Sequence, residues 1–181
     1  MEEIRCTTDT AYHCLTHFEK IDDRTRAELI AVGYTDVQID GQLKKPGSKF
    51  RASFAQSPQH VVEKLKKECP DVMKNLPEPD AKGRVRPSFV LKQEIGTDGV
   101  VETSTLTPEE LSTMRTESRN GCLIRKVRTS RTVYTNECQM VLEKDGDGWS
   151  VITMYPGIQA PPLPKDGESD PFWDCHCFIE F

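Results

Sequence analysis

The strongest pattern of hydrophobic and polar positions lies between Arg131 and Gly157. Two runs rich in β-branched and aromatic residues flank the segment Lys144–Gly148, and such runs are typical of strands. The glycines of that segment supply the positive φ angles that a tight or bulged hairpin turn requires. We therefore predict a long β-hairpin. Because side chains alternate across a strand, we expect one face of its second strand to carry Trp149, Val151, Thr153 and Tyr155, and the other Ser150, Ile152 and Met154.

The first part of the chain has helical patterns instead. Residues 8–33 predict two helices separated by a break near Ile21–Asp23, where an aspartate caps the second helix. Ser57-Pro58 places a serine at the N-cap and a proline at the first position of a further helix, which ends at Pro70. Two other segments are expected to be a turn with a short strand and a connecting loop, Gly41–Phe54 and Asp71–Lys82.

The second half of the chain predicts strands again. Residues 86–95 and 100–106 flank Gly96-Thr97-Asp98-Gly99, so we expect a second hairpin there. Thr107-Pro108-Glu109-Glu110 is a capping box with a proline at the first helical position, which predicts a short helix to about Arg115.

Two more segments have strand character, and together the elements define a fold class. They are Cys122–Ile124 and the aromatic end of the chain, Phe172–Phe181. The order is helices first and then mostly antiparallel strands, which predicts an α+β fold with N-terminal helices packed on an antiparallel sheet and a prominent C-terminal hairpin. We expect a single domain over 1–181, with a helical part (1–70), a sheet part (84–157) and an acidic, aromatic tail (158–181).

Composition narrows the class of protein. Hydrophobic residues make up 36% and charged residues 29% of the chain, and no apolar run is long enough to span a membrane. The N-terminus does not resemble a signal peptide, so we expect a chain that is cytoplasmic as made. The formal net charge is −5, which argues against general nucleic-acid binding. Seven scattered cysteines are expected to be reduced.

The distribution of charge leaves room for a local phosphate site. Residues 162–181 carry a net charge of −4, so the rest of the chain is almost neutral. That remainder holds two basic clusters, which are Lys44, Lys45, Lys49 and Arg51, and Arg119, Arg125, Lys126, Arg128 and Arg131.

The histidines, basic clusters and hairpin hydroxyls together suggest one kind of chemistry. Cleavage of RNA without a metal needs a base for the 2′-OH proton and an acid for the leaving 5′-oxygen. It also needs cations or hydrogen-bond donors around the phosphorane, whose charge grows in the transition state. Histidine suits the first two roles because its ordinary pKa is near neutrality. His13 and His17 lie four residues apart, on one face of the predicted first helix.

Three short motifs resemble RNase A-like and related toxin nucleases found at the C-termini of bacterial contact-dependent-inhibition proteins. They are Thr16-His17-Phe18, Gly47-Ser48-Lys49-Phe50-Arg51-Ala52-Ser53-Phe54, and the strand that ends in Thr153-Met154-Tyr155-Pro156.

The resemblance implies roles for individual residues and partners for the chain. It makes His17, or His13, a general acid or base, and Thr153 and Tyr155 active-site hydroxyls. Positive and polar residues would hold the substrate phosphates: Arg51, Lys45, Lys49, Ser53, Arg128 and Arg131. It further implies an endoribonuclease that leaves a 2′,3′-cyclic phosphate, RNA as substrate, no cofactor, an immunity or inhibitor protein as partner, and delivery into a target cell by a secretion system.

Each of these residues also has a plain structural interpretation. A single histidine is more often an ordinary helix residue, a lysine cluster is usually a solvated loop, and Thr153 and Tyr155 suit any strand. A zinc site is a second possible chemistry, because Cys175-His176-Cys177 could join Cys6, His13 and Cys14, although the paired spacing of structural zinc sites is missing. We expect buried thiols and no metal. Asp145-Gly146-Asp147-Gly148 resembles half a calcium loop and is expected to be a turn.

A different class of function stays open as well. The chain could be a non-catalytic binding or interaction module of the same fold. Its acidic, aromatic tail could dock on a partner, cover the basic residues of its own chain, or form a core strand, and the cost of exposing Phe172 and Trp173 favours the core strand. No nucleotide-binding or hydrolase motif is present in the sequence, which argues against a cofactor enzyme.

Overall fold

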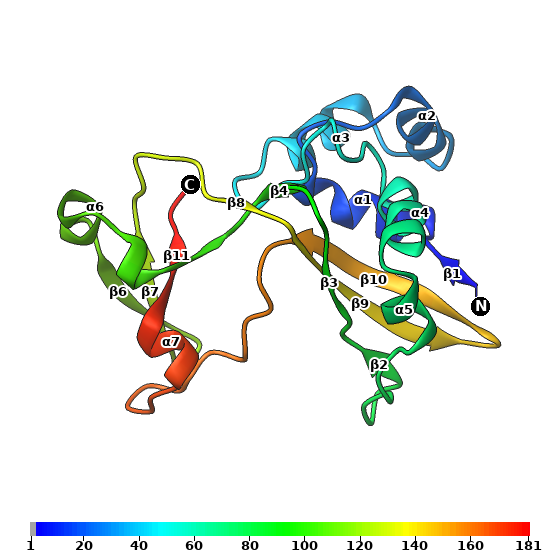
Figure 1. Ribbon diagram of the computed structural model, residues 1–181. Helices are drawn as coiled ribbons and strands as arrows, with labels where there is room; N and C mark the ends of the chain where they lie inside the picture. The colour runs from blue at the N-terminus through cyan, green and yellow to red at the C-terminus, as the bar shows by residue number, and fades with distance from the viewer. Residues whose placement is uncertain (1–2) are drawn as a thin grey trace.

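Two β-sheets organise the chain, and the computed structural model describes them over residues 3–181 (Figure 1). The first sheet has the order β1-β10-β9-β2, with β3 also paired to β9, and consists of β1 (Ile4–Arg5), β10 (Gly148–Pro156), β9 (Glu137–Asp145), β2 (Arg84–Val85) and β3 (Ser88–Val90). The second has the order β5-β11-β7-β6 and consists of β5 (Val100–Glu102), β11 (His176–Ile179), β7 (Cys122–Val127) and β6 (Arg115–Arg119). A small ladder of β4 (Gly96–Thr97) and β8 (Tyr134–Thr135) lies between the sheets. The predicted α+β class is confirmed.

The predicted C-terminal hairpin is confirmed as β9 and β10, but its first strand begins at Glu137, because Tyr134 and Thr135 form β8 and pair with β4 instead. Its ladder contains a bulge, because Val151 pairs with Leu142 but Thr153 already pairs with Val141. The extra residue shifts the alternation of side chains by one. Trp149, Val151 and Met154 are therefore all buried in one core, and the predicted division of faces is wrong beyond the bulge. Thr153 and Tyr155 still lie on a common side, opposite Met154.

The helical elements between residues 8 and 74 cover the first sheet. They are α1 (Thr8–Cys14), the 3₁₀ turn η1 (Leu15–His17), α2 (Asp23–Ala31), α3 (Asp36–Leu43), α4 (Pro58–Glu68) and α5 (Pro70–Lys74). The predicted caps are present: an Asp22 carboxylate oxygen accepts from Thr25 N at 2.7 Å, and Ser57 Oγ accepts from His60 N at 3.1 Å. The break between the first two helices is confirmed.

Two helices lie where we expected turns and loops. α3 runs through Gly41, and α5 occupies the start of the segment that was expected to be a loop. α3 has a full capping box formed by Thr35 and Gln38, so its signal was present in the sequence. The short strand expected before Phe54 is reduced to isolated bridges of Phe50 with Phe18 and Gly96.

The predicted second hairpin is wrong. β3 pairs with β9 in the first sheet, whereas β5 pairs with β11 in the second, so the two runs of residues separate. Their burial explains the difference, because Phe89 of β3 belongs to the first hydrophobic core and Val101 of β5 to the second. Local strand propensity identified both strands, but each strand's partner is decided by the core that buries it.

The first sheet and helices α1–α5 form the first lobe of the molecule. The second sheet and its helices form the second lobe, which has a smaller hydrophobic core. Its helices are α6 (Pro108–Ser112), which begins at the predicted capping box, the 3₁₀ turn η2 (Thr103–Thr105), and α7 (Pro171–Cys175). The strand expected at Cys122–Ile124 is confirmed as part of β7. β11 lies between β5 and β7, so the aromatic end of the chain is an inner strand, as the core-strand interpretation predicted. Trp173 of α7 is buried and its Nε1 donates to the Pro161 and Pro162 carbonyls.

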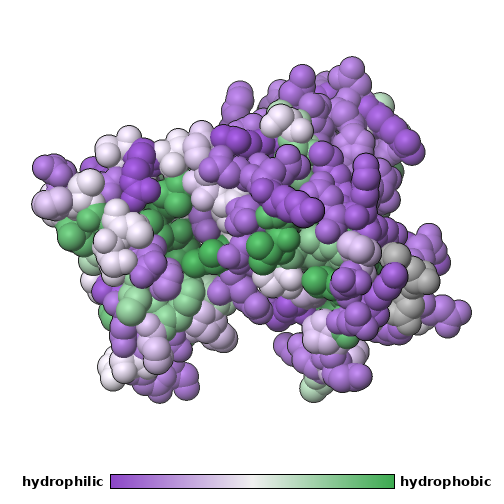
Figure 2. All heavy atoms as spheres, in the orientation of Figure 1, coloured by the Kyte–Doolittle hydropathy of each residue, from purple (hydrophilic) through white to green (hydrophobic). Residues whose placement is uncertain are grey.

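The chain passes between the two lobes after β4, after β7 and after β10 (Figure 1). Buried hydrophobic residues form two separate clusters, one for each sheet. On the face shown in Figure 2, hydrophilic residues cover the N-terminal helices, and hydrophobic residues gather over the second lobe and near the junction of the lobes. Within residues 3–181 no helix is long and apolar enough to cross a membrane. The single-domain organisation stays a prediction.

Candidate functional site

The imidazole of His17 is held in one orientation by the backbone of another segment. Its Nδ1 lies 3.0 Å from the carbonyl oxygen of Ser48, and the Phe50 amide donates to the His17 carbonyl at 2.7 Å. A carbonyl only accepts, so Nδ1 carries the proton and donates it, and Nε2 carries the lone pair. Burial lowers the pKa of His17, and the nearby charge of Lys49 lowers it further. The ring is therefore a neutral base at pH 7.

Tyr155 of β10 lies beside this imidazole. The two ring centroids are 5.7 Å apart, and the ring planes are inclined at 41°. Burial raises the pKa of the Tyr155 phenol, so its hydroxyl keeps its proton at neutral pH and is a hydrogen-bond donor. The resemblance described above places these two residues in one site, and the structure brings their rings together.

Lys49 places a positive charge next to His17. Its Nζ donates to the carbonyl oxygens of Thr16 at 2.7 Å and of Leu43 at 2.8 Å, which fixes the side chain between η1 and α3. The backbone of Lys49 also bonds to β4, because its amide donates to Thr97 Oγ1 and its carbonyl accepts from Thr97 N, both at 2.9 Å. The segment that carries Ser48 and Lys49 is therefore held by hydrogen bonds to the ends of η1 and α3 on one side and to β4 on the other.

A cavity of about 230 Å³ opens next to these residues. Three polar side chains line it, those of Ser48, Asp98 and Tyr155, and Ser48 connects the cavity to His17. Val100 and Phe178 of the second lobe complete the wall, so the cavity lies where the two lobes meet. Its volume is below that of most small-molecule pockets but ample for a phosphate group.

Asp98 lines this cavity although no motif in the sequence indicated a functional role for it. It was interpreted as part of a hairpin turn, Gly96–Gly99, where aspartate is common and carries no functional signal. In the structure it is only 6% exposed. Burial raises the pKa of Asp98 to about 6. A buried carboxyl with a perturbed pKa in a cavity is a typical member of an active site.

A larger cavity, of about 640 Å³, lies between α5 and the β9–β10 turn. Its lining combines apolar residues such as Met73 and Trp149 with the charged Lys74, Glu78 and Lys144. We place the candidate site at the smaller cavity, because its walls hold groups that can accept and donate protons near neutral pH.

Thr153 lies near the site but faces a different neighbour. Its hydroxyl is hydrogen-bonded to the buried thiol of Cys14, at the end of α1. Burial raises the pKa of this thiol to about 11, so Cys14 is an inert, protonated group at pH 7. Thr153 thus joins β10 to the helix that leads into His17, and its role as an active-site hydroxyl stays a prediction.

The other residues predicted in the first lobe are dispersed. The Arg51 guanidinium lies 4.1 Å from the ring centroid of Tyr134 and 3.5 Å from Glu94 Oε2. His13, Lys45 and Ser53 are exposed. Their roles in substrate binding or catalysis stay predictions.

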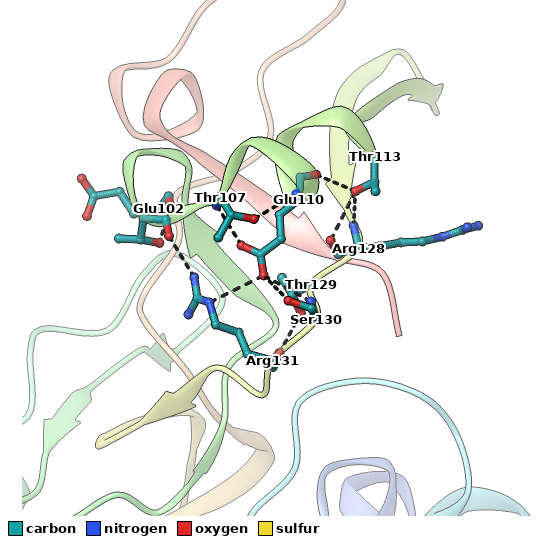
Figure 3. A network of polar contacts seen from close by, with 9 residues as sticks. Glu102, Thr107, Glu110, Thr113, Arg128, Thr129, Ser130 and Arg131 are labelled. Carbon is teal, nitrogen blue, oxygen red and sulfur yellow. Dashed lines mark hydrogen bonds and ion pairs between the residues drawn. The ribbon is translucent and has the colours of Figure 1, made fainter.

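Arg128 and Arg131 belong to the second lobe (Figure 3). Arg128 Nε lies 3.2 Å from a Glu180 carboxylate oxygen. Arg131 Nε lies 3.6 Å from Glu110 Oε1, and its Nη2 donates to the Thr105 carbonyl. Both guanidinium groups thus pair with carboxylates of their own lobe, and their role in substrate binding stays a prediction.

Neither the possible zinc site nor the calcium-like loop gathers a set of metal ligands within the described residues. In the described range 3–181, no group of three or more histidine, cysteine, aspartate or glutamate residues could hold a metal ion. His176 stacks on Phe172 with ring centroids 4.0 Å apart, and its Nδ1 lies 2.8 Å from the Phe172 carbonyl. The calcium-like segment is the β9–β10 turn, and its Asp145 accepts from Ser150 Oγ at 2.9 Å.

Comparison with known proteins leaves the family open. No family model and no curated protein matches this sequence. Among solved structures, the chain is similar to a chain of the CdiA-CT/CdiI complex from Y. kristensenii 33638, at 13% sequence identity and a TM-score of 0.29. The match covers 78% of this chain and 95% of that chain. A TM-score of this size does not establish a common fold.

Proposed function

We propose that the chain is a metal-independent endoribonuclease, which cleaves RNA by attack of the 2′-OH on the adjacent phosphate and leaves a 2′,3′-cyclic phosphate. The proposal depends above all on one observation, the hydrogen bond of His17 Nδ1 to the Ser48 carbonyl. This bond leaves Nε2 as a neutral base of fixed direction, and a protonated phenol lies beside the same ring.

Each side chain of the site has a role in this reaction. His17 Nε2 takes the proton of the 2′-OH as the oxygen attacks phosphorus. The Tyr155 hydroxyl donates a hydrogen bond to a non-bridging phosphate oxygen, where negative charge grows. Lys49 adds a positive charge that attracts the phosphate, and it also lowers the pKa of His17, which keeps the base unprotonated at neutral pH.

Buffered incubation with total RNA tests the proposal. The purified chain, supplied with EDTA, should produce fragments that end in a 2′,3′-cyclic phosphate. His17→Ala should lose about 10²–10⁴-fold in cleavage rate, the contribution of a positioned base. His60→Ala is a matched control, because His60 is an exposed histidine on α4. Equal activity of His17→Ala and the wild-type chain would contradict the proposal.

A non-catalytic binding module is the second candidate. One observation favours it: β6 forms an outer edge of the second sheet, and most of its residues are exposed. An exposed edge strand can accept a strand from a partner. If the chain binds a labelled RNA or a partner protein at micromolar concentration but leaves RNA intact at every pH between 5 and 8, the binding module is the better description.

A further inference from the structure

Asp98 lies in a cradle that the surrounding backbone shapes for a carboxylate. Its Oδ1 accepts from Val100 N at 3.0 Å, and its Oδ2 accepts from Ile158 N at 3.2 Å. Gly157 completes the cradle with a φ of +139°. A Cβ at Gly157 would lie 2.8 Å from Asp98 Oδ1, so only glycine admits the carboxylate at this place.

The same carboxylate shares the 230 Å³ cavity with Tyr155 and Ser48. The carbonyl of Ser48 accepts from His17 Nδ1, and the ring of Tyr155 lies against the imidazole, so two residues of the cavity that holds Asp98 also contact His17. Apart from these polar groups the walls are largely apolar, with Val100, Pro156 and others. Such walls weaken hydration of the carboxylate and favour its protonated form.

We propose that Asp98 is the proton donor of the cleavage reaction, which protonates the 5′-oxygen while His17 removes the proton of the 2′-OH. This inference rests on the proposed function and completes it, because cleavage needs an acid as well as a base. His17 and Asp98 would thus share the two halves of the proton transfer, and Tyr155 between them would stabilise the phosphorane.

The step balances without any further reactant. The O2′–P bond forms and the P–O5′ bond breaks. The proton of the 2′-OH moves to Nε2 of His17, and the carboxyl proton of Asp98 moves to O5′. The products are a 2′,3′-cyclic phosphate and a free 5′-OH, with an imidazolium and a carboxylate in the site. Exchange of one proton with water, out from His17 and in to Asp98, restores the starting state.

The charges around both groups bring their pKa values toward one another. Burial and the nearby Glu137 raise the pKa of Asp98, and backbone amides, including those of Val100 and Ile158, oppose them, with a result of about 6. Burial and Lys49 lower the pKa of His17, against the Ser48 carbonyl. A raised acid pKa and a lowered base pKa increase the joint population of protonated acid and free base that proton transfer needs.

Asp98 also has a structural role, because its carboxylate joins two of the connections between the lobes. The test must therefore distinguish loss of a proton donor from loss of this structural contact. The test therefore compares two substrates. Uridylyl-adenosine needs a proton on its 5′-oxygen, whereas uridine 3′-(p-nitrophenyl phosphate) releases a stable phenolate without one. Asp98→Asn should lower cleavage of the dinucleotide by about 10²–10⁴-fold and change cleavage of the aryl ester little. His17→Ala should lose activity on both.

The outcomes separate the inference from the proposed function. Equal losses on both substrates, or no loss on the dinucleotide, would refute the role of Asp98 and leave the nuclease in place. Failure of the wild-type chain to cleave either substrate would refute both.

The wild-type chain gives a second test that does not depend on the folding of Asp98→Asn. Its dinucleotide cleavage should fall as pH rises above about 6, where Asp98 loses its proton. The aryl ester should lack this alkaline fall, and identical pH profiles would contradict the proposal.

Discussion

The ring of His17, on a single turn of 3₁₀ helix, lies 5.7 Å from the ring of Tyr155 at the end of β10. The turn directly follows α1, and α1 packs against β10, where the side chains of Cys14 and Thr153 form a hydrogen bond. The contact between the first helix and the last strand of the first lobe thus sets the distance between the proposed base and the phenol.

The Tyr155 hydroxyl should matter for catalysis and little for stability. Tyr155→Phe keeps the ring next to His17 and removes only the donor to the phosphorane. We expect a loss of about 10²–10³-fold in RNA cleavage, as for the removal of one oxyanion donor. Thermal unfolding should show a similar midpoint. Tyr134→Phe, at a half-exposed tyrosine outside the cavity, is the matched control, and a similar loss there would argue against a specific role of Tyr155.

Lys49 should contribute to stability as well as to charge. Lys49→Met leaves the Thr16 and Leu43 carbonyls without their donor, which costs about 1–3 kcal/mol in the free energy of unfolding. Lys45→Met, at an exposed lysine of the same cluster, should stay within about 0.5 kcal/mol. Urea unfolding of the two variants measures the difference. A Lys49→Met chain as stable as the wild type would show that water replaces the lysine at both carbonyls.

Some parts of this site could be predicted from the sequence. The helix caps at Asp22 and Ser57 and the glycine turn of the hairpin depend on residues within a few positions of each other, and all are present. The pairing of His17 with Tyr155 was expected from the resemblance, and the structure brings the two rings together.

Other parts depend on contacts between distant segments. No local pattern assigns Phe89 and Val101 to different cores, and the bulge after Val151 leaves no clear trace in the sequence. Asp98 looks like a turn residue until the backbone near Gly157 encloses it. The cavity forms only where the two lobes meet, so no single segment of the sequence encodes it.

Gly96 should tolerate no side chain. A Cβ at this position would lie 2.3 Å from the Lys49 carbonyl oxygen, which is fixed by Thr97 N. Gly96→Ala should force β4 away from the segment of Ser48 and Lys49, at a cost of about 1–3 kcal/mol. Gly41→Ala is the control, since nothing lies within 4 Å of its Cβ in α3, and it should gain about 0.5–1 kcal/mol. Chemical denaturation compares both, and equal effects would contradict this close approach.

Glu110 should make the second lobe sensitive to acid. Its carboxylate accepts from the Thr107 and Ser130 amides and lies near Arg131, which together lower its pKa below the ordinary 4.5 (Figure 3). A depressed pKa stabilises the fold above pH 4.5, and this contribution is lost as pH falls through the lower folded value. Glu110→Gln should therefore destabilise the chain at pH 7 and much less at pH 3.

Thermal unfolding at the two pH values measures this dependence on Glu110. Glu109→Gln, at the exposed neighbour in α6, should show no such dependence. A Glu110→Gln deficit that is equally large at pH 3 would assign the effect to packing and not to ionisation.

Removal of residues 162–181 tests whether the acidic, aromatic tail is structural or regulatory. The deletion takes away β11, which lies between β5 and β7, together with Cys177 and Trp173 of the buried surface. Without β11 those two strands lose their shared partner and expose unpaired edges, so the shortened chain should aggregate or lose its second lobe. Size-exclusion chromatography and circular dichroism would show this. Because the second lobe also supplies Val100 and Phe178 to the cavity, RNA cleavage should fall with it. A soluble, monomeric chain with increased cleavage would instead identify the tail as an inhibitory segment.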